Sequence, residues 1–208
     1  MFTFIQVVAA IKWVNDIIAS LVEQGRRVEI LNERYFHHMF SSYLASIGRV
    51  NATWDDLAIY PEYTTNFQFL RREIRLNDPE NTRNNAIGTG RAGNLDFRIP
   101  SDPPISVEWK GPKNCPQQDL AEVFIKLLSQ DEKENKIIAA IFLTKSGGRN
   151  HVDNLIDKLG SSLQFACDVC EIESLEDQNL YAYIRSQYEG GCHEIWWGRV
   201  SEADFHAL

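Results

Sequence analysis

Little in the sequence points to a secreted or membrane-embedded protein. Its 208 residues include four cysteines, and residues 1–11 carry no positive charge ahead of Lys12. A signal peptide begins with positive charge before its apolar segment, and disulfide-built domains use cysteine far more densely. No stretch reaches the roughly 18 apolar residues that a membrane helix needs. We therefore expect reduced thiols, a cytoplasmic location and no membrane association.

An excess of positive charge is also missing. The net charge is −8 and the isoelectric point is about 5.1. Proteins that coat nucleic acid without specificity depend on lysine and arginine to neutralise phosphates. The composition therefore argues against that class of protein. An acidic chain can still act on nucleic acid where a local basic surface and metal ions anchor it.

Several catalytic motifs are absent or incomplete. The glycine-containing residues 145–149 follow an apolar run but lack the Gly-Lys-Ser/Thr end of a phosphate-binding loop. His37, His38 and His151 lack metal-ligand spacing, and no nucleophile elbow occurs. The absence of these motifs argues against the commonest classes of nucleotide-binding and acyl-transfer enzymes.

The spacing of the cysteines suggests one specific role for them, a zinc site. Cys167 and Cys170 with Cys192 and His193 would supply two pairs of ligands. However, adjacent residues on a strand point to opposite faces, which separates the second pair. Buried thiols account for these cysteines better.

The apolar content of the chain is sufficient for one sizeable core. Hydrophobic residues make up 44% of the 208, and no long linker, repeat or low-complexity tract divides them. We predict a single domain over residues 1–208, with a helical extension over residues 1–30 and a core over about 33–144. The polar residues 77–93 are predicted to form a mobile loop.

Hydrophobic periodicity predicts alternating helices and strands. Across the middle of the chain the order is strand, strand, helix, strand, helix, which implies a mixed sheet with a crossover and an α/β or α+β three-layer core. The expected helices cover residues 4–23, 32–44, 117–130 and 151–163, and the expected strands cover 65–74, 94–99, 105–110, 136–144 and 193–200.

Two of these strands carry the most informative residues. Residues 94–99 and 105–110 alternate apolar and polar side chains, as half-buried strands do, and a proline-rich turn joins them. If that turn is the loop of a hairpin, Ile99 faces Ile105, and the same register sets Asp96 opposite Glu108. Lys110 follows on the same face as Glu108.

Two opposed carboxylates need neutralisation, because like charges about 5 Å apart across a strand pair repel. Mg²⁺ suits this position, since it binds one or two carboxylates and holds phosphate oxygens in its remaining coordination positions. Lys110 would then stabilise developing charge, orient the attacking water or deprotonate it. The alternative is a surface hairpin in which Asp96, Glu108 and Lys110 form solvated ion pairs.

Asp96 on one strand and Glu108-Trp109-Lys110 on the next resemble the signature of the PD-(D/E)XK nuclease superfamily, which includes restriction endonucleases and Holliday-junction resolvases. The resemblance implies a restriction-endonuclease-like core with a mixed central sheet flanked by helices. It also implies hydrolysis of phosphodiester bonds with Mg²⁺, or Mn²⁺ as a substitute, bound by Asp96 and Glu108. DNA is the expected partner, RNA is less favoured, and a homodimer is compatible. Asn94-Leu95 stands where many members have a proline.

The resemblance extends to two further residues. Glu33, at the start of the helix over 32–44, matches a glutamate that members such as the resolvases place near the metal. Gln118, or its neighbour Gln117, matches a glutamine that often contacts the metal-bound water or the phosphate. Helix capping by Asn32 with Glu33 beside the helix dipole, and a solvent-exposed glutamine, are the structural alternatives.

The sequence therefore predicts a metal-dependent nuclease. The alternative is a catalytically silent relative that binds nucleic acid or a partner protein. Nearby arginines would either contact phosphate or act as ordinary surface charge; they are Arg71, Arg72, Arg75, Arg83 and Arg91.

Overall fold

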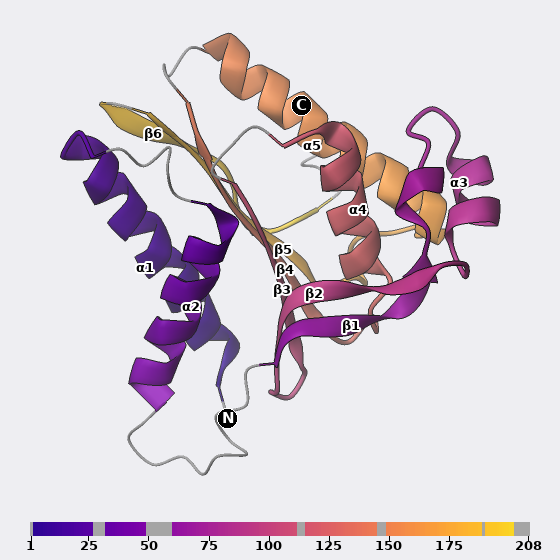
Figure 1. Cartoon of the computed structure of the whole chain (residues 1–208), viewed down its shortest axis with the longest axis horizontal. Coiled ribbons are helices and arrows are strands. Elements are labelled where there is room, and N and C mark those ends of the chain that lie inside the picture. Colours follow the sequence, from indigo (N-terminus) through magenta and orange to yellow (C-terminus); the bar gives the residue numbers. More distant parts are fainter. Residues whose placement is uncertain are drawn as a thin grey trace.

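The computed structural model describes residues 2–26, 32–48, 60–111, 115–144, 149–188 and 190–201. Within them, five α-helices and a short 3-10 turn surround one six-stranded sheet (Figure 1). The predicted α/β class with a mixed central sheet is confirmed. The elements are α1 (Phe4–Glu23), α2 (Glu33–Gly48), β1 (Tyr60–Phe69), η3 (Arg71–Glu73), α3 (Pro79–Ala86), β2 (Arg91–Ile99), β3 (Ile105–Lys110), α4 (Gln117–Leu128), β4 (Asn135–Leu143), α5 (Arg149–Cys170), β5 (Leu180–Tyr188) and β6 (Gly191–Arg199).

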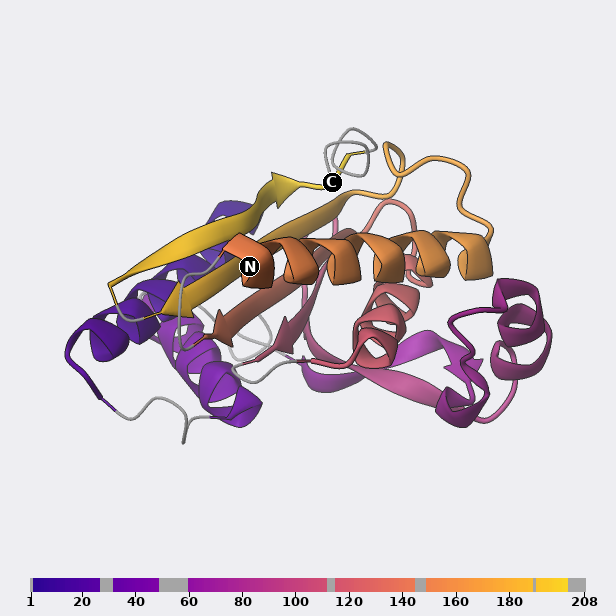
Figure 2. The same cartoon turned by 90° about the horizontal axis from the view of Figure 1, so that it is seen from above.

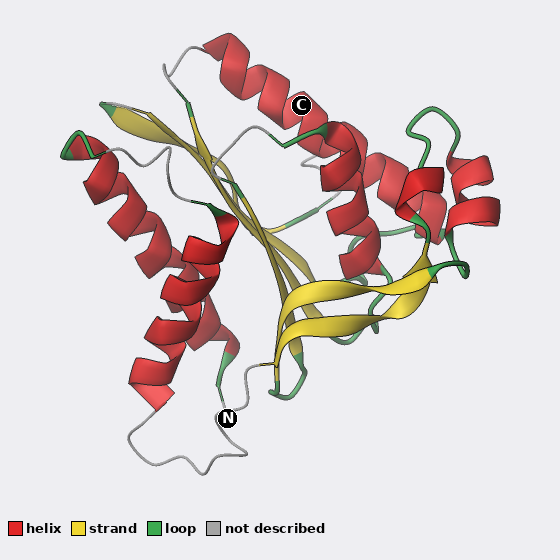
Figure 3. Ribbon diagram, viewed as in Figure 1, coloured by secondary structure: helices red, strands yellow, loops and turns green. Residues whose placement is uncertain are grey.

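The strands are in spatial order β1-β2-β3-β4-β5-β6. β3, β4 and β5 are parallel, whereas β1, β2 and β6 join them by antiparallel pairing. The helices α4 and α5 make the crossovers that parallel neighbours require. Helices α1 and α2 cover one face of the sheet and α4 and α5 cover the other (Figures 1 and 3). Seen from above, α5 lies lengthwise over the sheet and α3 lies beyond it (Figure 2).

Each face of the sheet has its own apolar core. One core joins α1 and α2 to the sheet through side chains such as Phe36, Phe40 and Trp109. The other joins α4 and α5 to the sheet through Phe124 and Leu159, among others. Two stacked cores are what a sheet with helices on both faces requires.

The first helix, α1, packs against one of the two apolar cores. Val7, Ile11, Val14 and Ile18 recur at steps of three or four and are fully buried against α2 and the sheet. The sheet also continues past Leu143, since β5 and β6 complete it. In the described part of the chain, α1, predicted as part of a helical extension over residues 1–30, therefore packs in the same core as α2 and the sheet.

By length and composition alone, α1 would be able to cross a membrane, and it is the one helix of the described residues that meets this test. The expectation that no segment reaches that length and apolarity was therefore too strict. In the structure the buried stripe of α1 packs on the protein interior, as the stripe of a core helix does.

Two local predictions were wrong. The polar residues 77–93, expected to be a loop, contain α3, whose first turn is capped by the Asp78 side chain accepting from the Asn81 N–H at 2.9 Å. Pro79 stands at the first helical position, where its missing N–H costs nothing. The strand expected over 65–74 lies earlier, as β1, and η3 follows it. The sheet also contains β5, which the periodicity did not reveal.

The predicted half-burial of the second hairpin strand was also wrong. β3 lies inside the sheet, with helices over both faces, so its polar positions are covered as well. Ser106 and Glu108 are both fully buried. A carboxylate in that position needs partners, because a buried charge without them is costly.

Candidate functional site

The hairpin register that the sequence predicts is present for three residue pairs. Ile99 pairs with Ile105, Arg98 with Ser106, and Phe97 with Val107, and the pairing ends there, one position before Asp96 and Glu108. At that point the Trp109 N–H donates to Oδ2 of Asp96 at 2.6 Å. The Asp96 carboxylate is therefore fixed to the neighbouring strand.

The strand β2 changes face at Asp96. Leu95 packs in the core under α4, whereas Phe97 and Ile99 pack in the core under α2. Strict alternation would have placed these three side chains on one face, as the sequence analysis assumed. The change of face lies at the position of the predicted metal ligand.

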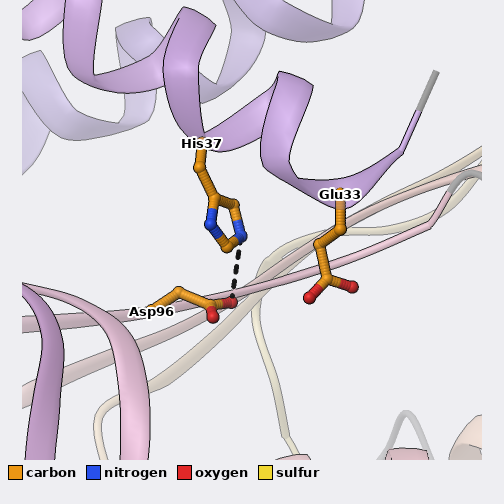
Figure 4. A group of neighbouring side chains, drawn as sticks. All are labelled: Glu33, His37 and Asp96. Atoms are coloured by element: carbon orange, nitrogen blue, oxygen red, sulfur yellow. Dashed lines mark ion pairs between the residues drawn. The ribbon is translucent and has the colours of Figure 1, made fainter.

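The helix α2 brings two side chains to Asp96. Glu33 and His37 lie one turn apart at the start of the helix, and both point toward the Asp96 carboxylate (Figure 4). Nε2 of His37 lies 3.4 Å from Oδ2 of Asp96. One ligand atom from each of the three residues lies within 4.8 Å of the others. Residues with such spacing can share one cation.

Glu108 is the most perturbed acid of the site. Its Oε1 lies 3.3 Å from Nζ of Lys126 on α4, and its Oε2 lies 3.8 Å from Nζ of Lys110. Burial and then the nearby Asp96 charge raise the pKa of Glu108 to about 8, and the two lysines offset this only in part. Oε2 has no hydrogen-bond partner among the described residues.

Lys110 faces three acids at once. Its Nζ lies 3.1 Å from Oε1 of Glu33, in addition to its contact with Glu108. Burial opposes its charge, but the carboxylates of Glu108, Asp96 and Glu33 together raise the pKa of Lys110 above its ordinary value. The side chain is therefore an ammonium group at neutral pH, a donor and not a base.

Asp96 is shifted the opposite way from Glu108. Burial opposes its ionisation, but contact with His37, the charges of Lys110 and His37 and the Trp109 N–H outweigh it and lower the pKa of Asp96. The pKa values of these two neighbouring carboxyl groups therefore shift in opposite directions: Asp96 ionises more readily than usual and Glu108 less readily. Such divergence is common where acids gather at a functional site.

A cleft of about 330 Å³ opens beside these residues. Gly111, which follows the last residue of β3, has a φ of +123°, and a Cβ there would meet the Ile141 carbonyl oxygen at 2.1 Å. Only glycine therefore fits at position 111, directly after β3, where the chain lines the cleft. Charged side chains that reach the cleft include Glu33, Arg71, Lys110, Asp119, Glu122 and Lys126.

The structure gathers four of the five predicted site residues. Asp96, Glu108, Lys110 and Glu33 form one connected group of charges. Gln118 does not join it, because its amide donates to the carbonyls of Arg71 and Ile74 at 3.4 Å and so braces α4 against η3.

Two residues of the site were missed. His37 was dismissed for lacking spacing to other histidines, although it lies one helical turn after Glu33 on the same stripe, which was the available signal. Lys126 lies four residues after Glu122 on α4, and the two side chains are 3.8 Å apart. Nothing local in the sequence links Lys126 to Glu108, since they meet only through the crossover.

Most of the arginines near the cleft have acidic or carbonyl partners. Arg71 pairs with Asp119 and with Glu122, the latter at 2.9 Å. Arg83 contacts Glu171 at 2.7 Å and main-chain carbonyls at the end of α5. Arg83 is therefore a brace between α3 and α5, and Arg71 is the arginine that lines the cleft.

The residues present suit a divalent cation. Glu33, His37 and Asp96 offer two carboxylates and an imidazole, and carboxylates and imidazole are common ligands of divalent metals. The unpartnered Oε2 of the fully buried Glu108 is a further oxygen donor next to Asp96.

Comparisons of this chain with family models, with curated proteins and with solved structures found no match. The resemblance to the PD-(D/E)XK superfamily thus rests on the motif residues and their arrangement.

Proposed function

We propose that the protein is a metal-dependent nuclease of the PD-(D/E)XK type that hydrolyses phosphodiester bonds, with DNA as its substrate. One observation supports this above the others. Asp96, Glu108, Lys110 and Glu33 come from two strands and a helix, yet they form one group of charges, and Glu33 and Lys110 of this group line a cleft. A surface hairpin with solvated ion pairs would leave Glu108 exposed, and it is fully buried.

The proposed reaction adds one water molecule across a phosphodiester. The water oxygen attacks phosphorus, the bond from phosphorus to the leaving oxygen breaks, and a water proton ends on that oxygen. The products are a phosphate monoester and an alcohol. Negative charge grows on the phosphate oxygens and on the leaving oxygen during this step.

A divalent cation held by Asp96, with Glu33, His37 or Glu108, would neutralise this charge and help to ionise the attacking water. The ammonium of Lys110 would donate to a phosphate oxygen as its negative charge grows. The raised pKa of Lys110 supports this role over that of a general base. Glu33 would hold the ammonium in place through their 3.1 Å contact.

A second function is supported by a different observation. Lys126 and Lys110 already lie against the two oxygens of Glu108, so lysines partly neutralise the acids without a metal. A catalytically silent protein of this fold, binding nucleic acid or a partner protein, would use such a network only to stabilise its core. Metal binding separates the two functions.

The test is cleavage of labelled single-stranded, double-stranded and branched DNA and the matching RNAs, each with Mg²⁺ or Mn²⁺. The wild-type protein should cut at least one DNA, and Asp96→Asn should cut none. Lys12→Met changes an exposed residue of α1 and is the control for the effects of substitution and purification. It should cut like the wild-type protein. If the wild-type protein binds nucleic acid but cuts nothing in either metal, the silent function replaces the nuclease.

A further inference from the structure

The cation ligands that the structure brings together include a nitrogen. The sequence predicted an all-carboxylate site of Asp96, Glu108 and Glu33. The three residues whose ligand atoms lie within 4.8 Å of one another are Glu33, His37 and Asp96. All three are partly buried, and Figure 4 shows the imidazole pointing toward the Asp96 carboxylate, with Glu33 on the same helix beside it.

The spacing of these atoms matches ligands around one small ion. In an octahedral site with bonds of about 2.1 Å, adjacent ligands lie about 3.0 Å apart and opposite ligands about 4.2 Å apart. Nε2 of His37 and Oδ2 of Asp96 lie 3.4 Å apart. Movements of less than about 1 Å in these side chains would therefore complete the coordination of one ion.

Two polar atoms at the site have only long contacts. Nε2 of His37 lies 3.4 Å from Oδ2 of Asp96, and Oε2 of the fully buried Glu108 lies 3.8 Å from Nζ of Lys110. Most buried polar atoms in proteins are closely partnered, so these two atoms can accept a stronger ligand. A cation bound at Asp96 would provide it.

The orientation of the imidazole is fixed by its surroundings. Its ring packs edge-on against Phe97, with 5.3 Å between the ring centroids, and Phe97 is buried in the core under α2. Glu33 is likewise held, by Lys110 at 3.1 Å. Supporting contacts that orient metal ligands in this way are a regular feature of metal sites.

We propose that Glu33, His37 and Asp96 form a site that prefers Mn²⁺ to Mg²⁺, with His37 as the residue that sets the preference. This inference deepens the proposed function, because it names the cofactor of the same site. Imidazole nitrogen binds first-row transition metals well, whereas Mg²⁺ favours oxygen ligands and water. A site of three carboxylates would lack this selectivity.

Metal binding, measured without any substrate, tests this inference. Calorimetric titration of the metal-free wild-type protein should give a dissociation constant for Mn²⁺ at least about tenfold below that for Mg²⁺. His37→Ala should weaken Mn²⁺ binding by about tenfold or more and Mg²⁺ binding much less, so that the ratio collapses. His38→Ala is the matched control, since it removes an exposed imidazole from the next position of α2 and should preserve the ratio.

Pulsed electron paramagnetic resonance on the Mn²⁺-loaded protein gives a second readout that does not depend on a fall in affinity. Nitrogen coupling to Mn²⁺ should be present in the wild-type protein and in His38→Ala and absent in His37→Ala. No Mn²⁺ binding, equal affinity for the two metals, or bound Mn²⁺ without nitrogen coupling would each overturn the inference. A protein that binds Mn²⁺ through His37 and cleaves nothing would retain this inference and lose the proposed nuclease function.

Discussion

Two fully or almost fully buried glutamates lie near opposite ends of strand β3, and their partners differ. Glu108 belongs to the strand, whereas Glu134 directly precedes β4 and contacts β3 through Ser106. At the start of β3, Glu134 accepts from Ser106 through Oε1, and its Oε2 lies 3.2 Å from Arg98. Near the end of β3, Glu108 has one oxygen 3.3 Å from Lys126 and the other 3.8 Å from Lys110. Neither Oε2 makes a hydrogen bond among the described residues, but Oε2 of Glu134 lies closer to its cation than Oε2 of Glu108 does.

The residues around Glu108 and Glu134 also differ. Glu108 lies beside a second carboxylate, Asp96, which with burial raises its pKa to about 8, and the cleft adjoins this end of the strand. Two residues after Glu134, on β4, stands Lys136, a buried lysine whose ammonium donates to the main-chain oxygen of Gln178 at 3.1 Å and to its Oε1 at 2.9 Å. We call Glu134, Ser106, Arg98, Lys136 and Gln178 the closed network.

Burial alone therefore does not identify a functional acid. The closed network contains a buried glutamate whose charge is matched within the fold, as structural ion pairs are. The cleft end crowds two acids and leaves Oε2 of Glu108 at 3.8 Å from the ammonium of Lys110, which costs stability in the absence of a ligand. Substitutions at the two ends should separate these roles.

The largest difference is expected from neutralising each glutamate in turn. Glu108→Gln should reduce cleavage to background, because it removes an oxygen donor for the cation at the reacting phosphate. Glu134→Gln should leave cleavage per folded molecule unchanged. Initial rates at saturating Mn²⁺, normalised to the folded fraction by circular dichroism, check both. Equal activity in the two variants would remove the distinction between the two ends.

A somewhat smaller loss is expected at Lys110. Lys110→Met should lower the cleavage rate about 10²–10³-fold, because it removes one preorganised donor to the charge of the transition state. The variant should still bind the metal, since the ammonium is not a ligand, although it loses the contact that holds Glu33. Single-turnover rates and metal titrations separate the two effects. Cleavage by Lys110→Met at the wild-type rate would exclude the catalytic role.

Stability should respond in the reverse order. Glu134→Ala should lower the free energy of unfolding by about 3 kcal/mol, because it leaves Arg98 and Ser106 without their buried acceptor. Glu108→Gln should leave the metal-free protein as stable as wild type or more so, since it relieves the crowding with Asp96. Urea denaturation without metal measures both. A larger loss for Glu108→Gln would mean that its lysine contacts stabilise the fold.

The smallest effect is a pH dependence of stability that differs between the ends. The pKa of Glu108 rises from 4.5 to about 8 on folding, so the free energy of unfolding of the metal-free protein should fall as pH rises through that range. Burial lowers the pKa of Lys136 from 10.5 to about 8, so its contribution should increase with pH from about 8 to 10.5. Each slope is at most about 1.4 kcal/mol per pH unit.

Paired variants assign these slopes. Glu108→Gln should flatten the lower range alone, and Lys136→Met should flatten the upper range alone. Urea denaturation across the pH range measures them. A Glu108→Gln profile parallel to that of wild type below pH 8 would mean that the acid is not strained in the folded protein.

The part of the site that could be predicted is the part that local pattern determines. Alternation and a proline-rich turn were sufficient for the register from Ile99–Ile105 to Phe97–Val107, which brings Asp96 near Glu108. Lys110 follows two residues after Glu108 on the same strand. The stripe of α2 pointed Glu33 and His37 inward, although only Glu33 was assigned a role.

The rest depends on how elements assemble. β3 lies inside the sheet because β4 pairs with it in parallel after a crossover, so no pattern within residues 105–110 reveals that Glu108 is fully buried. The same crossover brings Lys126 to Glu108 and turns Gln118 toward η3. Leu95 leaves the face of Phe97 where β2 bends between the two cores.

The central claim is that the cleft end of β3 holds a divalent cation, and anomalous diffraction from a Mn²⁺-soaked crystal tests it most directly. We predict an anomalous peak within about 2.3 Å of an Asp96 oxygen and of a ligand atom from α2. The closed network around Glu134 should show none. Absence of a peak at Asp96 under saturating Mn²⁺, or a peak only elsewhere, would contradict the account.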